Sequence, residues 1–165
     1  AKYTIKTTRK DYFEQEQTVA TRDNERVDID VSMKKLKDLI VVEDGVKKLK
    51  TDVIYFNFDK SQIRDDAGKE LGKVVEVMNE YPDMVIKIES HTDSRGKASY
   101  NKYLSDKRAK STRDYLISQG IDSQRIESAI GYGEEHLING CADGVSCSRV
   151  NHELNRRSEI IIVKM

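Results

Sequence analysis

The feature that most constrains the fold is an alternating apolar segment that passes through a short polar turn into a long helical pattern. Met84, Ile86 and Ile88 alternate with other residues up to Ser90, which predicts a strand with one buried face. Apolar residues at helical spacing then predict a helix over 98–118, ended by a glycine and with one face against a sheet. The residues of that face are Leu104, Thr112, Tyr115 and Leu116.

Two charged residues in this unit call for a partner. Asp93 follows the strand directly, in the sequence His-Thr-Asp-Ser-Arg-Gly. Arg108 lies four residues after Leu104 and seven after Asn101, so all three project from the same side of the expected helix. A guanidinium on a buried helix face is costly unless it is paired. The pair Asp93 and Arg108 is therefore the first candidate for a binding site.

The segments HTDSRG and NKYLSDKRAKSTRDYL, with IYFNFDKSQIRDDAGKEL before them and IGYGE and LNRRSE after them, resemble OmpA-like domains, the peptidoglycan-binding modules of Gram-negative cell envelopes. The resemblance covers roughly residues 50 to 165. It implies non-catalytic binding of peptidoglycan through diaminopimelate, held by an Asp and an Arg that correspond to Asp93 and Arg108. It also implies that Asp59, Asn101 and Arg156 line the same ligand.

Each of these residues also has a structural explanation. Asp93 could be only a turn residue whose side chain binds local amides, and Arg108 could be only the partner in a structural salt bridge. Asp59 could cap the turn before Ser61. We favour ligand binding for Asp93 and Arg108 because both fall within one long motif, and we leave Asp59 open.

The remaining pattern predicts an α/β sandwich, a small mixed sheet with helices on one face. We expect strands around Ile54, Phe56 and Phe58, over 125–130 and over 158–163. We also expect a helix that Asp65 or Asp66 caps. Its core positions are Leu71, Val74, Val75 and Met78.

Composition and charge exclude some partners. The chain has 165 residues with 29 basic and 29 acidic side chains, so nucleic acid is not an expected partner. The longest strongly apolar run is short of the ~20 residues of a spanning helix, so no transmembrane segment is expected. The chain begins with Ala1, which suggests a piece of a longer precursor. With the resemblance, we expect a periplasmic location at the outer membrane and cell wall, and other envelope proteins as further partners.

Cys141 and Cys147 are the only cysteines, and in an oxidising periplasm we expect them to form a disulfide. Two free thiols would be the alternative in the cytosol. His136 and His152 lie nearby, but their spacing fits no structural zinc pattern. No metal or cofactor is expected.

Residues 1–50 form a separate, β-rich part in this interpretation, before an OmpA-like domain over 51–165. Short strands are expected around Tyr3, Ile5 and Thr7, over 18–21, and around Val27, Ile29 and Val31. The segment KDYFEQEQTV is similar to the closing hairpin of carboxypeptidase regulatory-like β-sandwiches, so this part is either the remnant of such a domain or an extension of the next one. We expect 33–50 to be the connection.

Two other classes of function compete with wall binding. His91 and Asp93, together with Asp59, could form a hydrolytic centre on peptidoglycan. The chain has few histidines, no nucleophile motif and no phosphate loop, so we do not expect an enzyme. An envelope protein-interaction module is compatible with wall binding and remains the alternative.

Overall fold

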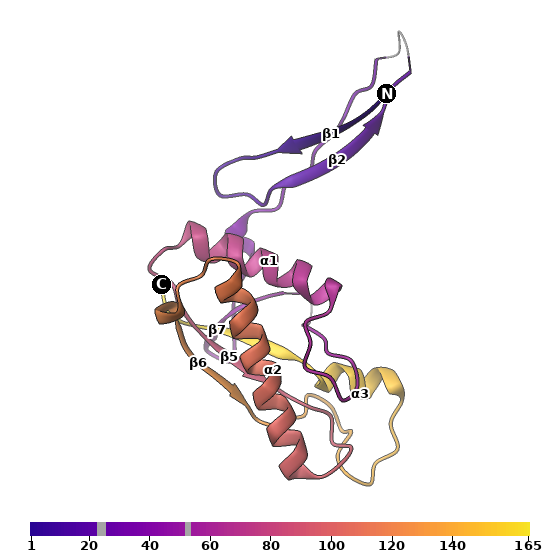
Figure 1. Cartoon of the computed structure of the whole chain (residues 1–165), viewed down its shortest axis with the longest axis vertical. Coiled ribbons are helices and arrows are strands. Elements are labelled where there is room, and N and C mark those ends of the chain that lie inside the picture. The colour runs from indigo at the N-terminus through magenta and orange to yellow at the C-terminus, as the bar shows by residue number, and fades with distance from the viewer. Residues whose placement is uncertain (23–25, 52–53) are drawn as a thin grey trace. The chain divides into compact units, whose positions relative to one another are not determined.

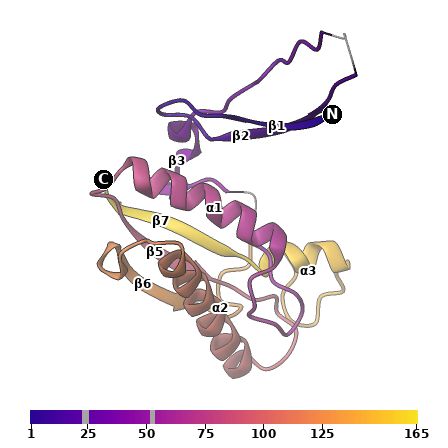
Figure 2. The same cartoon turned by 45° about the horizontal axis from the view of Figure 1, so that its top comes forward.

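The structure, a computed structural model, describes residues 1–22, 26–51 and 54–165. The chain divides into two compact units, Ala1–Leu39 and Ile40–Met165. Cartoons of the whole chain are shown in Figures 1 and 2.

The first unit is built on an antiparallel ribbon. Strand β1 (Lys2–Thr7) pairs with β2 (Gln15–Ala20), with Lys2 opposite Ala20, as the alternation in both segments predicts. Phe13 is buried within this unit. The third expected strand does not form: 27–31 pairs with neither strand of the ribbon.

The second unit contains a five-stranded mixed sheet in the order β3-β4-β7-β5-β6. The pair β5 and β6 is parallel, and the other neighbours are antiparallel. The strands are β3 (Ile40–Glu43), β4 (Val46–Leu49), β5 (Val85–Ser90), β6 (Ile126–Gly131) and β7 (Ser158–Lys164). The expected strands over 84–90, 125–130 and 158–163 are thus confirmed.

Within the described residues, three α-helices accompany the sheet: α1 (Asp65–Glu80), α2 (Ala98–Ser118) and the short α3 (Arg149–Asn155). Helices α1 and α2 cover one face of the sheet, as both views show (Figures 1 and 2). The expected α/β sandwich is confirmed. Its core contains Phe56, Leu71, Ile88, Leu116 and Ile160, all with at most 1% of their surface exposed.

The cap expected for α1 is wrong. Arg64 occupies the N-cap position and its side chain forms no capping hydrogen bond, although Asp66 Oδ1 accepts a hydrogen bond from the Ala67 N–H in the first turn at 3.0 Å. Asp65 and Asp66 instead lie in the first turn, where their charges interact favourably with the helix dipole. The expected core positions Leu71, Val74 and Met78 are buried, whereas Val75 is half-buried.

No strand forms at 54–58, contrary to expectation. Ile54 and Phe56 are fully buried, but Phe58 is 65% exposed. Strand β7 has both edges occupied, by β4 and β5, so this segment packs through its side chains. The carbonyl groups of Phe56 and Asn57 are consequently free to accept hydrogen bonds from arginine side chains.

The segment 33–50 is not a simple connection. Strands β3 and β4 form a hairpin whose turn, Asp44-Gly45, has positive φ at both residues, and β4 then pairs with β7. Leu49 is buried, and the Lys48 ammonium lies 2.8 Å from a Glu159 carboxylate oxygen. The boundary expected after residue 50 therefore comes after two strands that complete the sheet.

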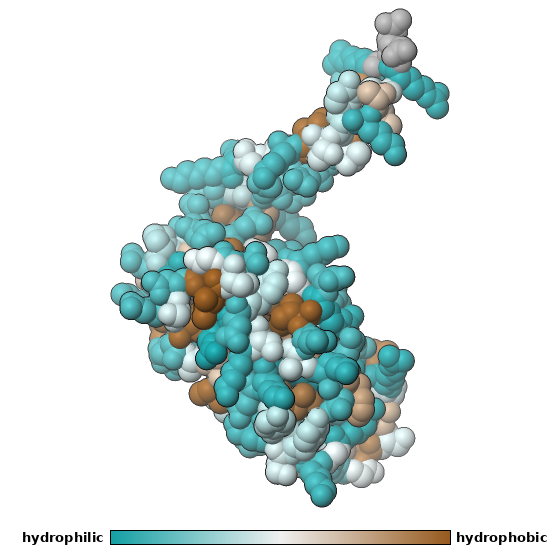
Figure 3. All heavy atoms as spheres, in the orientation of Figure 1, coloured by the Kyte–Doolittle hydropathy of each residue, from teal (hydrophilic) through white to brown (hydrophobic). Residues whose placement is uncertain are grey.

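The surface visible in Figure 3 is mainly hydrophilic, with apolar residues in small, separate patches. Within the described ranges, no helix has both the length and the apolar content needed to cross a membrane.

Candidate ligand-binding site

A cavity of about 260 Å³ lies beyond the carboxyl end of β5, beside the start of α2. All five residues that the sequence nominates line it, although they come from segments far apart in the chain. The lining consists of Phe58, Asp59, Thr92, Asp93, Arg95, Gly96, Tyr100, Asn101, Leu104, Arg108 and Arg156.

Asp93 is 3% exposed and is held by two arginines. Its Oδ1 accepts hydrogen bonds from the backbone N–H and Nε of Arg95, both at 3.1 Å. Its Oδ2 accepts from Nη2 of Arg95 at 2.8 Å and from Nη1 of Arg156 at 2.9 Å. These bonds occupy roughly the full acceptor capacity of a carboxylate. The local turn bond proposed as the structural explanation is present, but it is one of several.

The Asp93 carboxylate is ionised in the folded protein. Burial by itself raises its pKa, but hydrogen bonds from Arg95 and Arg156 outweigh that effect and hold the pKa below the ordinary value of 3.8. The same contact raises the pKa of Arg95.

Arg108 is fully buried, and its hydrogen bonds go to carbonyl groups. Nε donates to Lys60 at 2.9 Å, Nη1 to His91 at 3.3 Å and Nη2 to Asn57 at 3.2 Å. The guanidinium also lies 5.1 Å from the Phe56 ring centre. No carboxylate of a described residue forms an ion pair with it, so the structural salt bridge considered for Arg108 is not formed.

The burial of Arg108 also changes the pKa of its guanidinium. Burial, followed by the positive charge of Arg156, lowers it to about 10, while Asp93 and Asp59 act in the opposite direction. Arg108 is still a cation at neutral pH. It has more N–H donors than its three bonds to carbonyl groups use, so it can bind an anion.

Asn101 and Asp59 shape the two sides of the cavity. Asn101 is buried and its Nδ2 donates to the carbonyl groups of Asp93 and Arg95 at 3.2 and 3.3 Å. Asp59 is exposed, has a positive φ, and accepts a hydrogen bond from the Tyr100 hydroxyl at 2.5 Å. Asn101 therefore fixes the turn after β5, and Asp59 contributes a negative charge at the rim.

Sequence reasoning left Arg95 outside the site, yet it is the main partner of Asp93. Its guanidinium also lies 5.0 Å from the ring centre of the exposed Phe58. The sequence feature that could have identified Arg95 is its position two residues after Asp93 across a turn, which brings the two side chains together. Thr92 was missed as well, and its buried hydroxyl has no hydrogen-bond partner among the described residues.

The cavity has a net positive charge. Three guanidinium groups, those of Arg95, Arg108 and Arg156, face two carboxylates, those of Asp59 and Asp93. A ligand with a carboxylate for Arg108 and a cationic group for Asp93 would match both charges.

The arrangement does not form the acid–base centre considered for an enzyme. The His91 ring is buried and stacks on Tyr132, with 5.8 Å between ring centres, and neither of its nitrogens has a hydrogen-bond partner among the described residues. Burial, and then the charge of Arg157, lowers the pKa of His91 to about 4. His91 therefore stays neutral and takes no part in a pairing with Asp93. The described residues contain no cluster of three or more metal-ligating side chains.

Comparison with known proteins identifies the family. Residues 55–151 match the OmpA family, so the chain belongs to the OmpA family. Four of the five nominated residues fall in the matched range, and Arg156 follows it.

Two of the similar proteins are envelope proteins by name. The chain is 40% identical over 96 residues to the peptidoglycan-associated lipoprotein of Agrobacterium fabrum, covering 58% of this chain and 53% of that protein. It is 35% identical over 99 residues to outer membrane porin F of Pseudomonas aeruginosa, covering 58% of this chain and 28% of the porin. The chain thus spans about half the length, or less, of these curated relatives.

Solved structures show the same fold. The peptidoglycan-associated lipoprotein from Burkholderia pseudomallei superposes with a TM-score of 0.60 at 27% identity, over 68% of this chain and 90% of that one. The cell wall anchor of the type VI secretion system from Pseudomonas aeruginosa superposes with a TM-score of 0.55 at 21% identity, over 76% and 87% of the two chains.

Proposed function

We propose that this protein binds peptidoglycan non-covalently and without turnover, through the diaminopimelate of the stem peptide. The observation that carries the proposal is the buried Arg108 guanidinium, which has no carboxylate partner among the described residues and faces the same cavity as Asp93. A buried cation of this kind is stabilised when a ligand supplies the missing anion.

Diaminopimelate carries two charged groups that complement Asp93 and Arg108. Its free end carries an ammonium and a carboxylate on one carbon, whereas lysine carries the ammonium alone. Arg108 would bind the carboxylate and Asp93 the ammonium, through charge-assisted hydrogen bonds worth about 1.5–3 kcal/mol each. A lysine at the same position of the stem peptide would leave Arg108 without its anion. The site would therefore discriminate between cell walls with diaminopimelate in their stem peptides and cell walls with lysine there.

Binding would require Arg95 to move. The acceptor positions of Asp93 are filled, so an incoming ammonium must replace a donor. The side chain of Arg156 is 6% exposed and packed, whereas that of Arg95 is 44% exposed. Arg95 is therefore the donor that gives way, and Asp59, Asn101 and Arg156 remain as the wall of the site.

The names of the relatives support the cellular context of the proposal. Peptidoglycan-associated lipoproteins and a cell wall anchor share this fold. We place the domain in the periplasm of a Gram-negative-type envelope, where it would anchor an outer-membrane or periplasmic assembly to the wall. Other envelope proteins would be its further partners. The disulfide between Cys141 and Cys147, confirmed by the structure, suits an oxidising compartment.

Calorimetric titration tests the proposal. We expect saturable binding of a stem peptide that contains meso-diaminopimelate and much weaker binding of the same peptide with L-lysine in its place, because the lysine side chain carries only an ammonium. Arg108→Ala and Asp93→Asn should each reduce the affinity by about tenfold or more, because each removes charge-assisted bonds to the ligand. Arg108→Lys should also bind poorly, since lysine lacks the planar fork of donors.

Arg113→Ala is the matched control, because it removes an equal charge from α2 outside the cavity. Equal affinity of the wild-type protein for the diaminopimelate peptide and the lysine peptide would refute the mechanism. Incubation with purified sacculi separates an anchor from an enzyme: the anchor sediments with the wall, whereas a hydrolase releases soluble muropeptides.

A further inference from the structure

A second cavity, of about 470 Å³, lies next to the first one. Arg95 lines both cavities, and so forms part of the wall between them. The rest of the second lining comes from the turn after β5, from the loop that the disulfide closes and from α3: Ser94, 142–147, Arg149 and His152.

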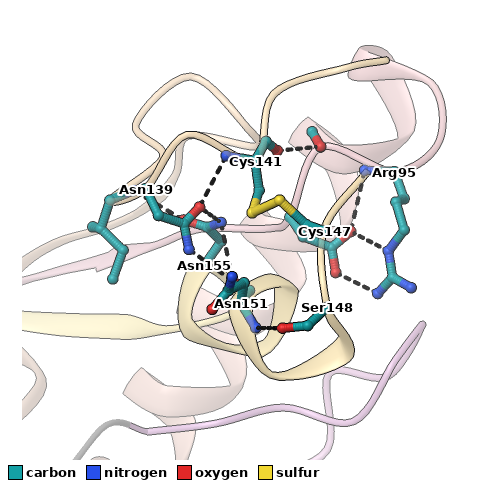
Figure 4. Close-up of a disulfide and its surroundings, with 10 residues drawn as sticks. Arg95, Asn139, Cys141, Cys147, Ser148, Asn151 and Asn155 are labelled. Carbon is teal, nitrogen blue, oxygen red and sulfur yellow. Dashed lines mark hydrogen bonds and ion pairs between the residues drawn. A yellow bond between two sulfur atoms is a disulfide. The ribbon is translucent and has the colours of Figure 1, made fainter. Parts of the chain in front are cut away.

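The disulfide loop is held in a defined shape. Cys141 and Cys147 are bonded, and the Cys141 carbonyl accepts a hydrogen bond from the Ser94 hydroxyl at 2.6 Å. The Asn139 side chain accepts from the Cys141 N–H at 3.2 Å and from Nδ2 of Asn155 at 2.8 Å. Figure 4 shows this network between the loop and α3, with Arg95 close by. These bonds therefore preorganise the wall of the second cavity for a ligand.

The second cavity is also lined by side-chain nitrogen groups that are not paired within the described residues. Arg149 is exposed and forms no ion pair with a carboxylate of a described residue. His152 is 6% exposed, and its Nδ1 has no partner among the described residues. One carboxylate, that of Asp143, faces the two guanidinium groups of Arg95 and Arg149 in this lining. The charge balance favours an anionic group.

We infer that this second cavity binds another carboxylate of the same stem peptide, outside the free end of diaminopimelate. The inference rests on the proposed function. Besides that free end, an unmodified stem peptide carries the α-carboxylate of its D-glutamate and the carboxylate of its C-terminal residue. Arg149 supplies the charge for such a group, and the unpaired Nδ1 of His152, when it carries the ring proton, can donate a further hydrogen bond to it.

Arg95 couples the two cavities. Once the ligand ammonium displaces it from Asp93, its guanidinium loses its carboxylate partner while it still lines the second cavity. The second carboxylate of the ligand can then take the place of Asp93 as the partner of Arg95. Filling one cavity therefore favours filling the other.

The test compares a stem tripeptide that contains diaminopimelate with a copy in which the D-glutamate α-carboxylate and the C-terminal carboxylate are amidated. Both copies keep the free end of diaminopimelate. We expect the wild-type protein to bind the acidic tripeptide about tenfold more tightly, the range of one charge-assisted contact. In Arg149→Ala this preference should be clearly reduced, while the affinity for the amidated copy stays the same.

A Cys141→Ser, Cys147→Ser double variant is a second check, because it should lose the preference by loosening the wall while it still binds the amidated copy. Arg113→Ala should keep the wild-type preference. Equal binding of the two peptides by the wild-type protein, or a preference of the same size in Arg149→Ala as in wild type, would overturn the second subsite and leave the first intact. Failure of both peptides to bind would overturn the proposed function and this inference together.

Discussion

At the scale of single residues, the site is defined by which of its charged groups already have a partner. Asp93 is ionised and has all its acceptor positions filled, whereas Arg108 is buried without a carboxylate partner among the described residues. The protein thus holds a negative group that is already paired beside a positive group that is not. A zwitterionic ligand would replace one donor of Asp93 with its ammonium and would supply Arg108 with a carboxylate.

This exchange predicts an unusual effect of one substitution. Arg95→Ala removes the side-chain donors that compete with the ligand ammonium for Asp93, so free meso-diaminopimelate should bind more tightly, by up to about tenfold. Calorimetric titration of the variant beside wild type and Arg113→Ala measures this. A large loss of affinity in Arg95→Ala would show that Arg95 holds the ligand instead of yielding to it.

A second prediction at this scale concerns pH and the buried His91. The unfolded chain takes up a proton at this residue as the pH falls below 6.5, but the folded protein does so only near its lowered pKa of about 4. The unfolded state therefore binds more protons in this window, and stability falls as the pH falls, by at most about 1.4 kcal/mol per pH unit.

Denaturant unfolding of wild type and His91→Phe at several pH values measures the effect. The phenylalanine ring can still stack on Tyr132 but does not titrate, so the difference between the two proteins should grow from pH 6.5 to pH 4. A constant difference over this range would show that His91 is accessible to protons in the folded state.

At the scale of elements, the strand-turn-helix unit at the centre of the site depends on a close approach between β6 and α2. Gly131 ends β6 against the helix, and its N–H donates to an Asp106 carboxylate oxygen at 2.8 Å. A Cβ at this position would overlap the backbone of Ser105 and Asp106. Only glycine fits there.

We therefore expect Gly131→Ala to destabilise the protein by about 1–3 kcal/mol, as other overpacking substitutions do. Gly72→Ala is the matched control: it lies within α1, has nothing within 4 Å of the added Cβ, and should stabilise by about 0.5–1 kcal/mol. Thermal melts of the two variants should shift in opposite directions, and an unchanged melt for Gly131→Ala would contradict the close packing.

The elements also show what sequence patterns can and cannot predict. Strands β5 and β7 alternate clearly, and the sequence predicted both of them and the bounds of helix α2 closely. The pattern at 54–58 alternates equally well, but β7 already has a neighbour on both edges, and only the complete sheet reveals this. The hairpin of β3 and β4 had a usable signal, the Asp44-Gly45 turn, which the sequence analysis did not use.

The sequence predicted which residues line the candidate site but not which of them form ion pairs with one another. The motif nominated five residues that the fold does bring to one cavity. It paired Asp93 with Arg108, whereas the structure pairs Asp93 with Arg95 and Arg156. Such contacts depend on where a turn and the end of a distant helix meet, so local spacing does not determine them.

At the scale of the whole molecule, the question is which part of the chain suffices for a stable domain. The sequence placed the boundary after residue 50, whereas the structure divides the chain between Leu39 and Ile40. The difference is the hairpin of β3 and β4, which pairs with β7 and buries Leu49. Without this hairpin, β7 would become an exposed edge strand that can pair with other copies.

This predicts different behaviour for two fragments. The fragment 40–165 should melt in one cooperative transition and bind meso-diaminopimelate with the affinity of the full chain, because it keeps the complete sheet and the whole cavity lining. The fragment 51–165 keeps the same lining but lacks β3 and β4, so it should melt at a lower temperature and associate with itself. Thermal melts, light scattering and calorimetric titration distinguish the two. Identical melts would show that the hairpin adds nothing to the stability of the sheet, and weaker ligand binding by 40–165 than by the full chain would show that residues 1–39 contribute to the site.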